Sequence, residues 1–346
     1  MNYRSLLIVC LATLGLAVAG WGQADGKDVD NPADPSLSAG IEQAVTSSGE
    51  EAWVVGAIRR LTDYSASYSS PSWSPDGQHI AFGFERDGRA KIYVIGLDGS
   101  NRRLTDHPAW AALPTWSPDG QHIAFVSERG VTDIYVIGSD GSDRRNLTND
   151  SHWDWSPSWS PDGQHIAFVS RRGSYGKAEI YVIDSDGSNS RRLTDHPEQV
   201  DSPTWSPDGQ HIAFVSERGA SDIYVMGSDG SNPRRLTDRR LTDPSADYKS
   251  PSWSPDGQYI AFESEWYDRV GIYVMDSDGS NPRRLTDRSA DYRSPSWSPD
   301  GRYIAFESNR DGDWGIYVMD IASYTGGEPT AVAETSWGRI KSLLSR

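Results

Sequence analysis

The chain has 346 residues, of which 36% are hydrophobic and 24% charged, and its formal net charge is −16. A protein that follows nucleic-acid phosphates needs a basic face, so this charge argues against that class and against adsorption to anionic lipid. The 14 Trp and 16 Tyr supply an aromatic core, and the 33 Gly and 20 Pro indicate many short turns in a folded chain.

Residues 1–24 have the pattern of a secretory signal peptide. Arg4 precedes an apolar run at 6–19, and the small residues Ala17 and Ala19, or Gly22 and Ala24, offer cleavage sites. A membrane anchor is the alternative, but the run is shorter than the ~20 residues that a spanning helix needs. The chain's single cysteine, Cys10, lies inside this segment, so the mature protein would contain no disulfide. We expect a periplasmic or secreted protein without a membrane span after cleavage.

Residues 25–50 are polar and lack a sustained period, which predicts a flexible linker. A repeated pentapeptide, Trp-Ser-Pro-Asp-Gly, organises the chain that follows. Its six copies begin at Trp73, Trp116, Trp159, Trp205, Trp253 and Trp297, at intervals of 43, 43, 46, 48 and 44 residues. This period is the length of one propeller blade. We therefore predict an all-β fold, a six-bladed β-propeller of four-stranded antiparallel blades over residues 51–333.

Each repeat predicts four strands separated by turn residues. In the second repeat they are expected at Pro114–Ser117, His122–Ser127, Asp133–Ile137 and Arg144–Thr148. The second and third strands are almost wholly apolar, which indicates that both of their faces are covered. The fourth strand, Arg-Arg-Leu-Thr, has one strongly apolar side chain and suits a guarded outer edge.

The outer strand of the sixth blade has two candidates, Arg59–Thr62 and Gly326–Val332. The first is favoured, because pairing the two ends of the chain closes the ring and removes an exposed edge. A tandem copy, Arg234–Asp238 followed by Arg239–Asp243, accounts for the longest interval, and one copy is expected to be looped out. Residues 334–346 predict a short C-terminal helical tail.

The repeat "P-S/T-W-S-P-D-G-Q-H/Y-I-A-F … I-Y-V-M … D-G-S-N … R-R-L-T" resembles that of TolB-type propellers over roughly residues 53–330. It is also similar to the propeller domain of prolyl-oligopeptidase-class peptidases. The chain leaves no room for the α/β domain of TolB or for a hydrolase domain. The resemblance therefore implies a lone six-bladed propeller, and it is more specific for fold than for function.

Comparison among the six repeats separates positions that serve the fold from positions that are free to vary. The repeat Trp, the Pro-Asp-Gly turn and the Ile-Ala-Phe strand recur in every copy and are explained by core packing and turn geometry. The sequence has no Gly-x-Ser-x-Gly elbow, phosphate loop or HExxH motif. We therefore expect no catalytic residues and no cofactor.

Three loop histidines supply the alternative hypothesis, a metal-dependent polysaccharide lyase or hydrolase that works in the propeller channel. Some propeller lyases that resemble TolB-type repeats bind a metal through three histidines, and His107, His152 and His196 would be the ligands here. Imidazoles must lie within ~2.1 Å of a common ion, so the spread of these residues over three blades argues against such a site.

Aromatic side chains interleaved with charges gather in the loops where the repeats differ, and these loops share one face of a propeller. This composition predicts a recognition surface for a protein or peptide partner, or for a glycan, on a monomeric, non-catalytic scaffold. The alternative is that several of the rings pack over the blades. The candidate binding residues are Trp110, Trp153, Trp155, Tyr175, Tyr248, Trp266, Tyr267, Tyr292 and Trp314.

Overall fold

The computed structural model describes residues 52–63, 66–107, 109–128, 130–173, 176–195, 198–218, 220–237, 246–266 and 269–324. Four predictions lie outside the described residues: the signal peptide 1–24, the linker 25–50, the candidate strand Gly326–Val332 and the tail 334–346. Within the described part of the chain, no helix has the length and apolarity that crossing a membrane requires.

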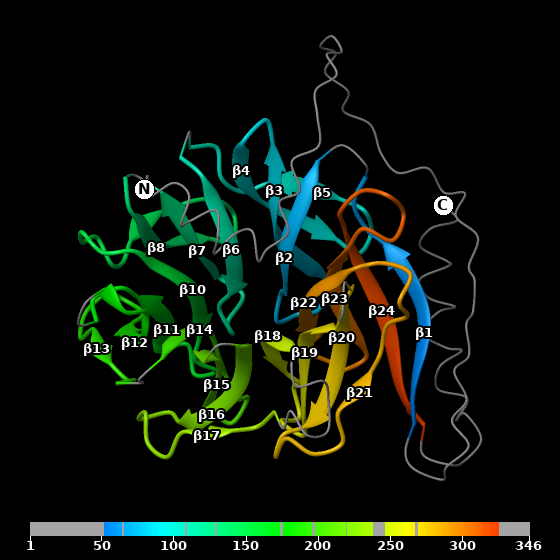
Figure 1. Ribbon diagram of the computed structural model, residues 1–346. Coiled ribbons are helices and arrows are strands. Elements are labelled where there is room, and N and C mark those ends of the chain that lie inside the picture. Colours follow the sequence, from blue (N-terminus) through cyan, green and yellow to red (C-terminus); the bar gives the residue numbers. More distant parts are fainter. Residues whose placement is uncertain are drawn as a thin grey trace. The chain divides into compact units, whose positions relative to one another are not determined.

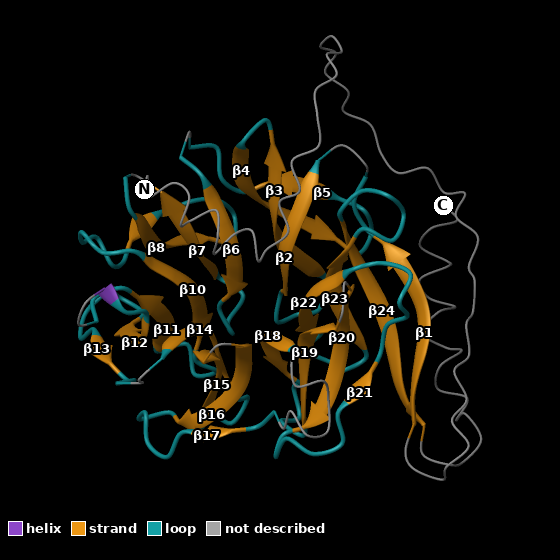
Figure 2. Ribbon diagram, in the orientation of Figure 1, coloured by secondary structure: helices purple, strands orange, loops and turns teal. Residues whose placement is uncertain are grey.

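The strands β1 to β24 form six four-stranded antiparallel sheets, the blades of a propeller (Figures 1 and 2). Blade one contains β2 (Ser67–Trp73), β3 (His79–Arg86), β4 (Arg89–Gly96) and β5 (Asn101–Arg103). Blade two contains β6 (Ala111–Trp116), β7 (His122–Glu128), β8 (Thr132–Gly138) and β9 (Arg145–Asn146). Blade three contains β10 (Asp154–Trp159), β11 (His165–Ser170), β12 (Glu179–Asp184) and β13 (Arg191–Arg192).

The remaining blades follow the same order. Blade four contains β14 (Gln199–Trp205), β15 (His211–Arg218), β16 (Ala220–Gly227) and β17 (Arg234–Arg235). Blade five contains β18 (Asp247–Trp253), β19 (Tyr259–Trp266), β20 (Arg269–Asp276) and β21 (Arg283–Arg284). Blade six contains β22 (Tyr292–Trp297), β23 (Tyr303–Ser308), β24 (Gly315–Tyr324) and, from the start of the chain, β1 (Ala52–Arg60).

The first strand of each blade contacts the first strands of both neighbouring blades, so six first strands surround the propeller axis (Figure 1). The predicted fold and strand order are confirmed. In blade two the first strand starts three residues before the predicted Pro114, and the fourth strand is limited to Arg145 and Asn146. Of the tandem copy, Arg234 and Arg235 form β17, whereas the second copy lies outside the described residues.

The N-terminal strand closes the ring, as predicted from Arg59–Thr62. β1 pairs antiparallel with β24 from Ala52 opposite Tyr324 to Arg60 opposite Tyr317. With 9 residues, β1 is far longer than the other outer strands, which have two or three residues each. The two ends of the propeller are therefore joined by an extended ladder of main-chain hydrogen bonds.

The guanidinium group of Arg60 binds both β24 and the loop that follows β1. Its Nε donates to the carbonyl oxygen of Thr62 at 2.7 Å, its Nη2 to that of Asp63 at 2.8 Å, and its Nη1 to the Tyr317 hydroxyl at 2.9 Å. Gly315 makes room for it, because a Cβ there would lie 2.7 Å from Arg60 Cζ. Blade five repeats the arrangement within one blade: Arg284 donates to the carbonyl oxygen of Thr286, and the facing residue is Gly271.

The core consists of apolar layers between adjacent blades. The six Phe of the second strands are at most 1% exposed, and each stacks on, or tilts against, a Tyr of the third strand. One cluster combines Ile92 and Val94 of blade one with Ile123 and Phe125 of blade two. Because every blade lies between two others, both faces of its middle strands are buried, which explains their continuous apolar sequence.

The six Trp-Ser-Pro-Asp-Gly turns contact one another in a closed circle, which we call the turn ring. In blade three, the Ser160 hydroxyl donates to Asp162 Oδ1 at 2.5 Å, and the glycine Gly163 has a φ of +70°. A Cβ on Gly120 would lie 3.2 Å from Cγ of Pro75 in the preceding blade. Equivalent contacts occur at all six turns, including Pro299 against Gly77, which completes the ring.

Replacing Gly120 with Ala is expected to lower the free energy of unfolding by about 2 kcal/mol, because the new Cβ adds a close contact with Pro75 to the strain of a left-handed backbone. Gly88 is the matched control: its φ is +69°, but no atom lies within 4 Å of the position that a Cβ would take, so Gly88→Ala carries the backbone strain alone. Urea denaturation of both variants measures the difference. Equal losses would contradict a contribution from the turn ring contact.

Candidate binding face

The variable loops leave the blades at one end of the strands, which we call the loop face. They join each outer strand to the next first strand, and each second strand to its third strand; the Trp-Ser-Pro-Asp-Gly turns lie at the opposite end, the turn face. This placement follows from the antiparallel order of the strands. The loops of the first kind are 61–66, 104–110, 147–153, 193–198, 236–246 and 285–291.

Two of the candidate binding residues, Tyr248 and Tyr292, are fully buried, with 0% exposure, so the prediction that they are exposed on this face is wrong. Each ring packs on the core of its blade. The Tyr292 hydroxyl donates to Asp287 Oδ1 at 2.6 Å, five residues earlier in the chain. Burial and this carboxylate raise the pKa of Tyr292 to about 12. The Tyr68 hydroxyl donates a hydrogen bond to Asp63 in the same way, and Tyr68 is 4% exposed. Tyr68 and Tyr292 therefore anchor their loops to the blades.

Four of the candidate tryptophans are partly exposed on the loop face: Trp110, Trp153, Trp155 and Trp314. The Trp314 ring lies beneath the guanidinium of Arg293, whose Cζ is 4.9 Å from the ring centroid. Tyr175 and Tyr267 lie outside the described residues, as does the side chain of Trp266. The structure thus leaves four indole rings, distributed over blades two, three and six, as the described aromatic surface of this face.

Near the loop face, each first strand has an equivalent position that follows a residue of the blade core and points to the other face of the sheet. In β14, Val200 is 1% exposed and packs in the blade core, whereas the next residue, Asp201, points to the opposite side of the strand and is partly exposed. The strand pairing gives the equivalent residues in the other blades. The residues at this position, from blade one to blade six, are Ser69, Ala112, Trp155, Asp201, Lys249 and Arg293.

Asp201 connects blade four to blade three. Its Oδ1 accepts hydrogen bonds from Trp155 Nε1 at 3.1 Å and Ser156 Oγ at 2.9 Å, and from the main-chain N–H of Ser202 at 2.6 Å. Burial raises the pKa of Asp201, against the effect of these hydrogen bonds. The indole of Trp155 is therefore held in one orientation by an acceptor on the neighbouring blade.

Two buried carboxylates connect blades five, six and one. Glu263 and Glu307 are 4% and 1% exposed, at a second-strand position that is Gly83, Val126, Val169 or Val215 in the other blades. The Ser294 N–H donates to Glu263 Oε1 at 2.7 Å, and the Ser70 N–H donates to Glu307 Oε1 at 2.8 Å.

The environment of Glu307 favours its protonated form. Burial is the main cause that raises its pKa, to about 7, and the nearby Glu263 acts in the same direction. Hydrogen bonds from Ser294 and Ser70 and the charge of Arg293 oppose this shift. Sequence reasoning missed both glutamates, although the replacement of an apolar repeat position by Glu is visible in the aligned repeats.

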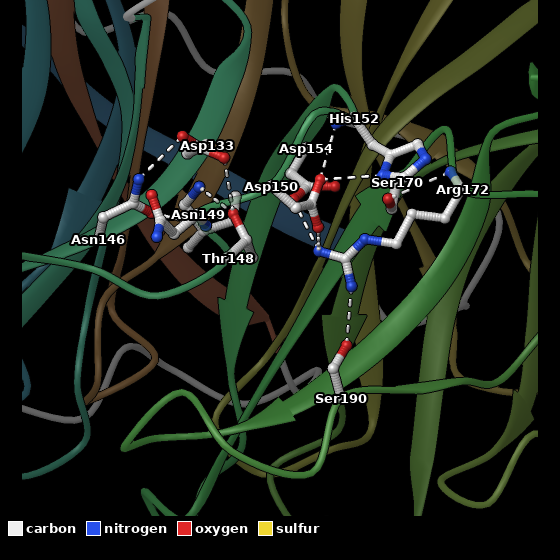
Figure 3. A network of polar contacts seen from close by, with 11 residues as sticks. Asp133, Asn146, Thr148, Asn149, Asp150, His152, Asp154, Ser170, Arg172 and Ser190 are labelled. Carbon is white, nitrogen blue, oxygen red and sulfur yellow. Dashed lines mark hydrogen bonds and ion pairs between the residues drawn. The ribbon is translucent and has the colours of Figure 1, made fainter.

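A polar network holds the loop that enters blade three (Figure 3). Arg172 Nη2 lies 2.6 Å from Asp150 Oδ2 and 2.9 Å from Asp154 Oδ2, and its Nη1 donates to Ser190 Oγ at 2.9 Å. His152 Nδ1 lies 3.0 Å from Asp150 Oδ1. This candidate metal ligand is thus paired with a carboxylate of its own loop, which is itself bound to Arg172.

The histidines of the metal hypothesis are not brought together as a described group. His107 Nδ1 accepts a hydrogen bond from the Ala109 N–H at 3.0 Å, His152 is paired with Asp150, and His196 lies outside the described residues. Among the residues that the structure describes, no three His, Cys, Asp or Glu side chains are grouped so that they could hold a metal ion.

The architecture defines the class of protein: a six-bladed β-propeller with an invariant turn face and a variable loop face. The chain matches the TolB beta propeller domain family over residues 53–175, 151–250 and 239–337, and it belongs to that family. The search among curated proteins found no match.

Two solved TolB structures are similar to this chain. A putative TolB from Agrobacterium tumefaciens has 26% sequence identity and a TM-score of 0.61, and the alignment covers 79% of this chain and 99% of that one. TolB from Acinetobacter baumannii has 27% identity and a TM-score of 0.62 over 69% of this chain, which spans only 59% of that longer protein.

Enzymes also carry this fold. An oligogalacturonate lyase from Vibrio parahaemolyticus has 14% identity and a TM-score of 0.54, with 82% of this chain and 97% of that one covered. Propeller-containing peptidases are found as well, as predicted from the repeat. Identities this low reflect the fold alone.

Proposed function

We propose that the protein is a non-catalytic binding module that engages a protein or peptide partner through its loop face. The observation that carries the proposal is the set of four partly exposed tryptophans on the face where the blades differ. Interfaces between proteins are enriched in Trp and Arg, and a few such residues supply most of the binding energy. Arg293 on Trp314 and Arg171 near Trp155 combine the two residue types at the loop face.

The proposal includes export and a monomeric state. Export to the periplasm or the medium rests on the signal-peptide pattern of residues 1–24. A folded propeller of this kind needs no second copy to cover an open sheet in its ring, because every blade lies between two others. A glycan is the alternative ligand, since indole rings also stack on sugars.

The double variant Trp153→Ala, Trp314→Ala tests the binding face on two blades that lie opposite each other in the ring. We expect its partner capture from the native envelope to fall by about tenfold or more, because truncating interface tryptophans removes more than 1 kcal/mol each. His122→Ala, on the turn face, is the control and should capture as the wild type does. Thermal unfolding of each variant is recorded in parallel.

Two outcomes would contradict this proposal. If the double variant unfolds, the rings belong to the core and not to a binding face. If the purified protein contains a stoichiometric transition metal that is lost on replacing His107, His152 and His196, the hypothesis of a metal-dependent polysaccharide lyase or hydrolase replaces the one proposed.

A further inference from the structure

Leu113 has a main-chain conformation that its side chain disfavours. It lies in the left-handed region with a φ of +53°, where bulky non-glycine residues are genuine outliers. The five equivalent residues are all serine, with φ between +49° and +52°, at Ser70, Ser156, Ser202, Ser250 and Ser294. The fold requires this conformation in every blade, but only blade two places a large apolar side chain there.

Leu113 is one of three loop-face side chains that pack against the same buried cluster. Trp110, Leu113 and Trp155 all pack against the cluster between blades two and three, and all three are partly exposed at the loop face. We call these three residues the apolar patch. At the first-strand position equivalent to Trp155, blades four to six instead carry the charged residues Asp201, Lys249 and Arg293. This position is therefore apolar in blades two and three and charged in blades four to six.

A positive charge borders the apolar patch. The guanidinium carbon of Arg171 lies 5.8 Å from the centroid of the Trp155 ring, and Arg171 is partly exposed. Trp155 itself is oriented by its hydrogen bond to Asp201. A ligand group placed on the patch would thus meet an ordered indole ring, a leucine side chain and, at the edge, a guanidinium group that matches a carboxylate.

We propose that the apolar patch receives one aliphatic or aromatic side chain of a partner segment, with an acidic group of the same segment beside Arg171. The proposal rests on the function proposed above, in that the loop face is where a partner binds, and it adds the chemistry of that partner. The unfavourable backbone conformation of Leu113 is retained because the side chain serves this contact, since strained positions persist where function uses them.

Two fluorescent probes test the patch without a natural partner. Anilinonaphthalene sulfonate combines aromatic rings with an anionic group, and Nile red is apolar and uncharged. The variants are Leu113→Ser, which makes all six blades alike at this position, and Arg171→Gln. Leu97→Ser is the control, because Leu97 is a partly exposed leucine on the turn face, between β4 and β5. Each probe is titrated well below the unfolding temperature of each variant.

We expect Leu113→Ser to weaken the binding of both probes at least fivefold. Arg171→Gln should weaken the binding of the anionic probe alone, and Leu97→Ser should change the binding of neither probe. Trp110→Ala, a second change within the patch, should reproduce the effect of Leu113→Ser. Probe binding that is absent in the wild type, or unchanged in both patch variants, would overturn the proposal. Loss of both probes with Leu97→Ser would overturn it as well.

Failure of this inference is distinguishable from failure of the proposed function. If the probes bind as expected but the native envelope yields no partner, the patch stands and the binding role of the face fails. If a partner is captured through Trp153 and Trp314 but Leu113→Ser leaves the probes unaffected, the face binds a partner and the proposed chemistry of the patch is wrong.

Discussion

Replacing Arg60 with Ala is expected to lower the free energy of unfolding by about 3 kcal/mol, because it removes several hydrogen bonds of a charged group, two of them to the buried residues Thr62 and Tyr317. Two of the lost contacts are local, to Thr62 and Asp63 just after the first strand, and the third joins that strand to Tyr317 of the last one. Urea denaturation followed by tryptophan fluorescence measures the loss. Arg59→Ala is the matched control on the same strand, and since Arg59 is exposed, we expect a change within about 0.5 kcal/mol.

Arg284→Ala separates ring closure from the local contact. Arg284 makes the same main-chain hydrogen bonds, to Thr286 at 2.7 Å and Asp287 at 2.6 Å, but it does so inside blade five. We expect both variants to lose stability, and only Arg60→Ala to expose β1 to early proteolysis, because that strand has no covalent neighbour in its blade. An unfolding midpoint for Arg60→Ala equal to that of the wild type would show that closure does not depend on this side chain.

Replacing Glu307 with Gln is expected to stabilise the protein by up to about 3 kcal/mol at about pH 8, with little effect at about pH 4.5. The folded-state pKa of Glu307 is raised to about 7 from an ordinary value of 4.5. The folded chain therefore binds the proton more tightly than the unfolded chain, so this group's contribution to stability is lost as the pH rises from about 4.5 to about 7. A Gln side chain still accepts the hydrogen bond from the Ser70 N–H and carries no charge to bury.

The measurement is the free energy of unfolding of wild type and variant across this pH range. Glu265→Gln, at an exposed residue of β19, is the control, and its free energy of unfolding should depend on pH as that of the wild type does. A Glu307→Gln protein that is less stable than the wild type at about pH 8 would contradict the prediction, and it would mean that the attraction between Glu307 and Arg293 outweighs the cost of burying the charge.

The architecture could be predicted from the sequence, because each blade repeats the same local signals. The spacing of the Trp-Ser-Pro-Asp-Gly copies sets the number of blades, and the apolar second and third strands indicate burial on both faces. Ring closure by the N-terminal strand was predictable from one orphan copy of the outer-strand motif. Its length was not, because Ala52 to Ile58 have no counterpart in the other outer strands, which end after two or three residues.

The binding face was only partly predictable, because a ring in a variable loop can point outward or inward. Tyr248 and Tyr292 have the same composition around them as the exposed tryptophans, yet both are buried. A signal was present: Asp63 precedes Tyr68, and Asp287 precedes Tyr292, by five residues, the spacing at which the hydroxyl reaches the carboxylate. The contacts of Arg60 with Gly315 and of Arg284 with Gly271 could not be predicted from the sequence, because the two partners lie on different strands.

The turn ring limits how this protein can change. Each proline of the ring lies against the glycine of the next blade, so adjacent blades meet through the same contact all around the ring, and a ring with more or fewer blades would have to make this contact at a different angle. The largest differences in length between repeats lie at the other end of the strands, where the loops that join one blade to the next range from 6 to 11 residues. The loops at that end could therefore be lengthened or exchanged without altering the arrangement of the blades, so the binding surface can change while the fold stays the same.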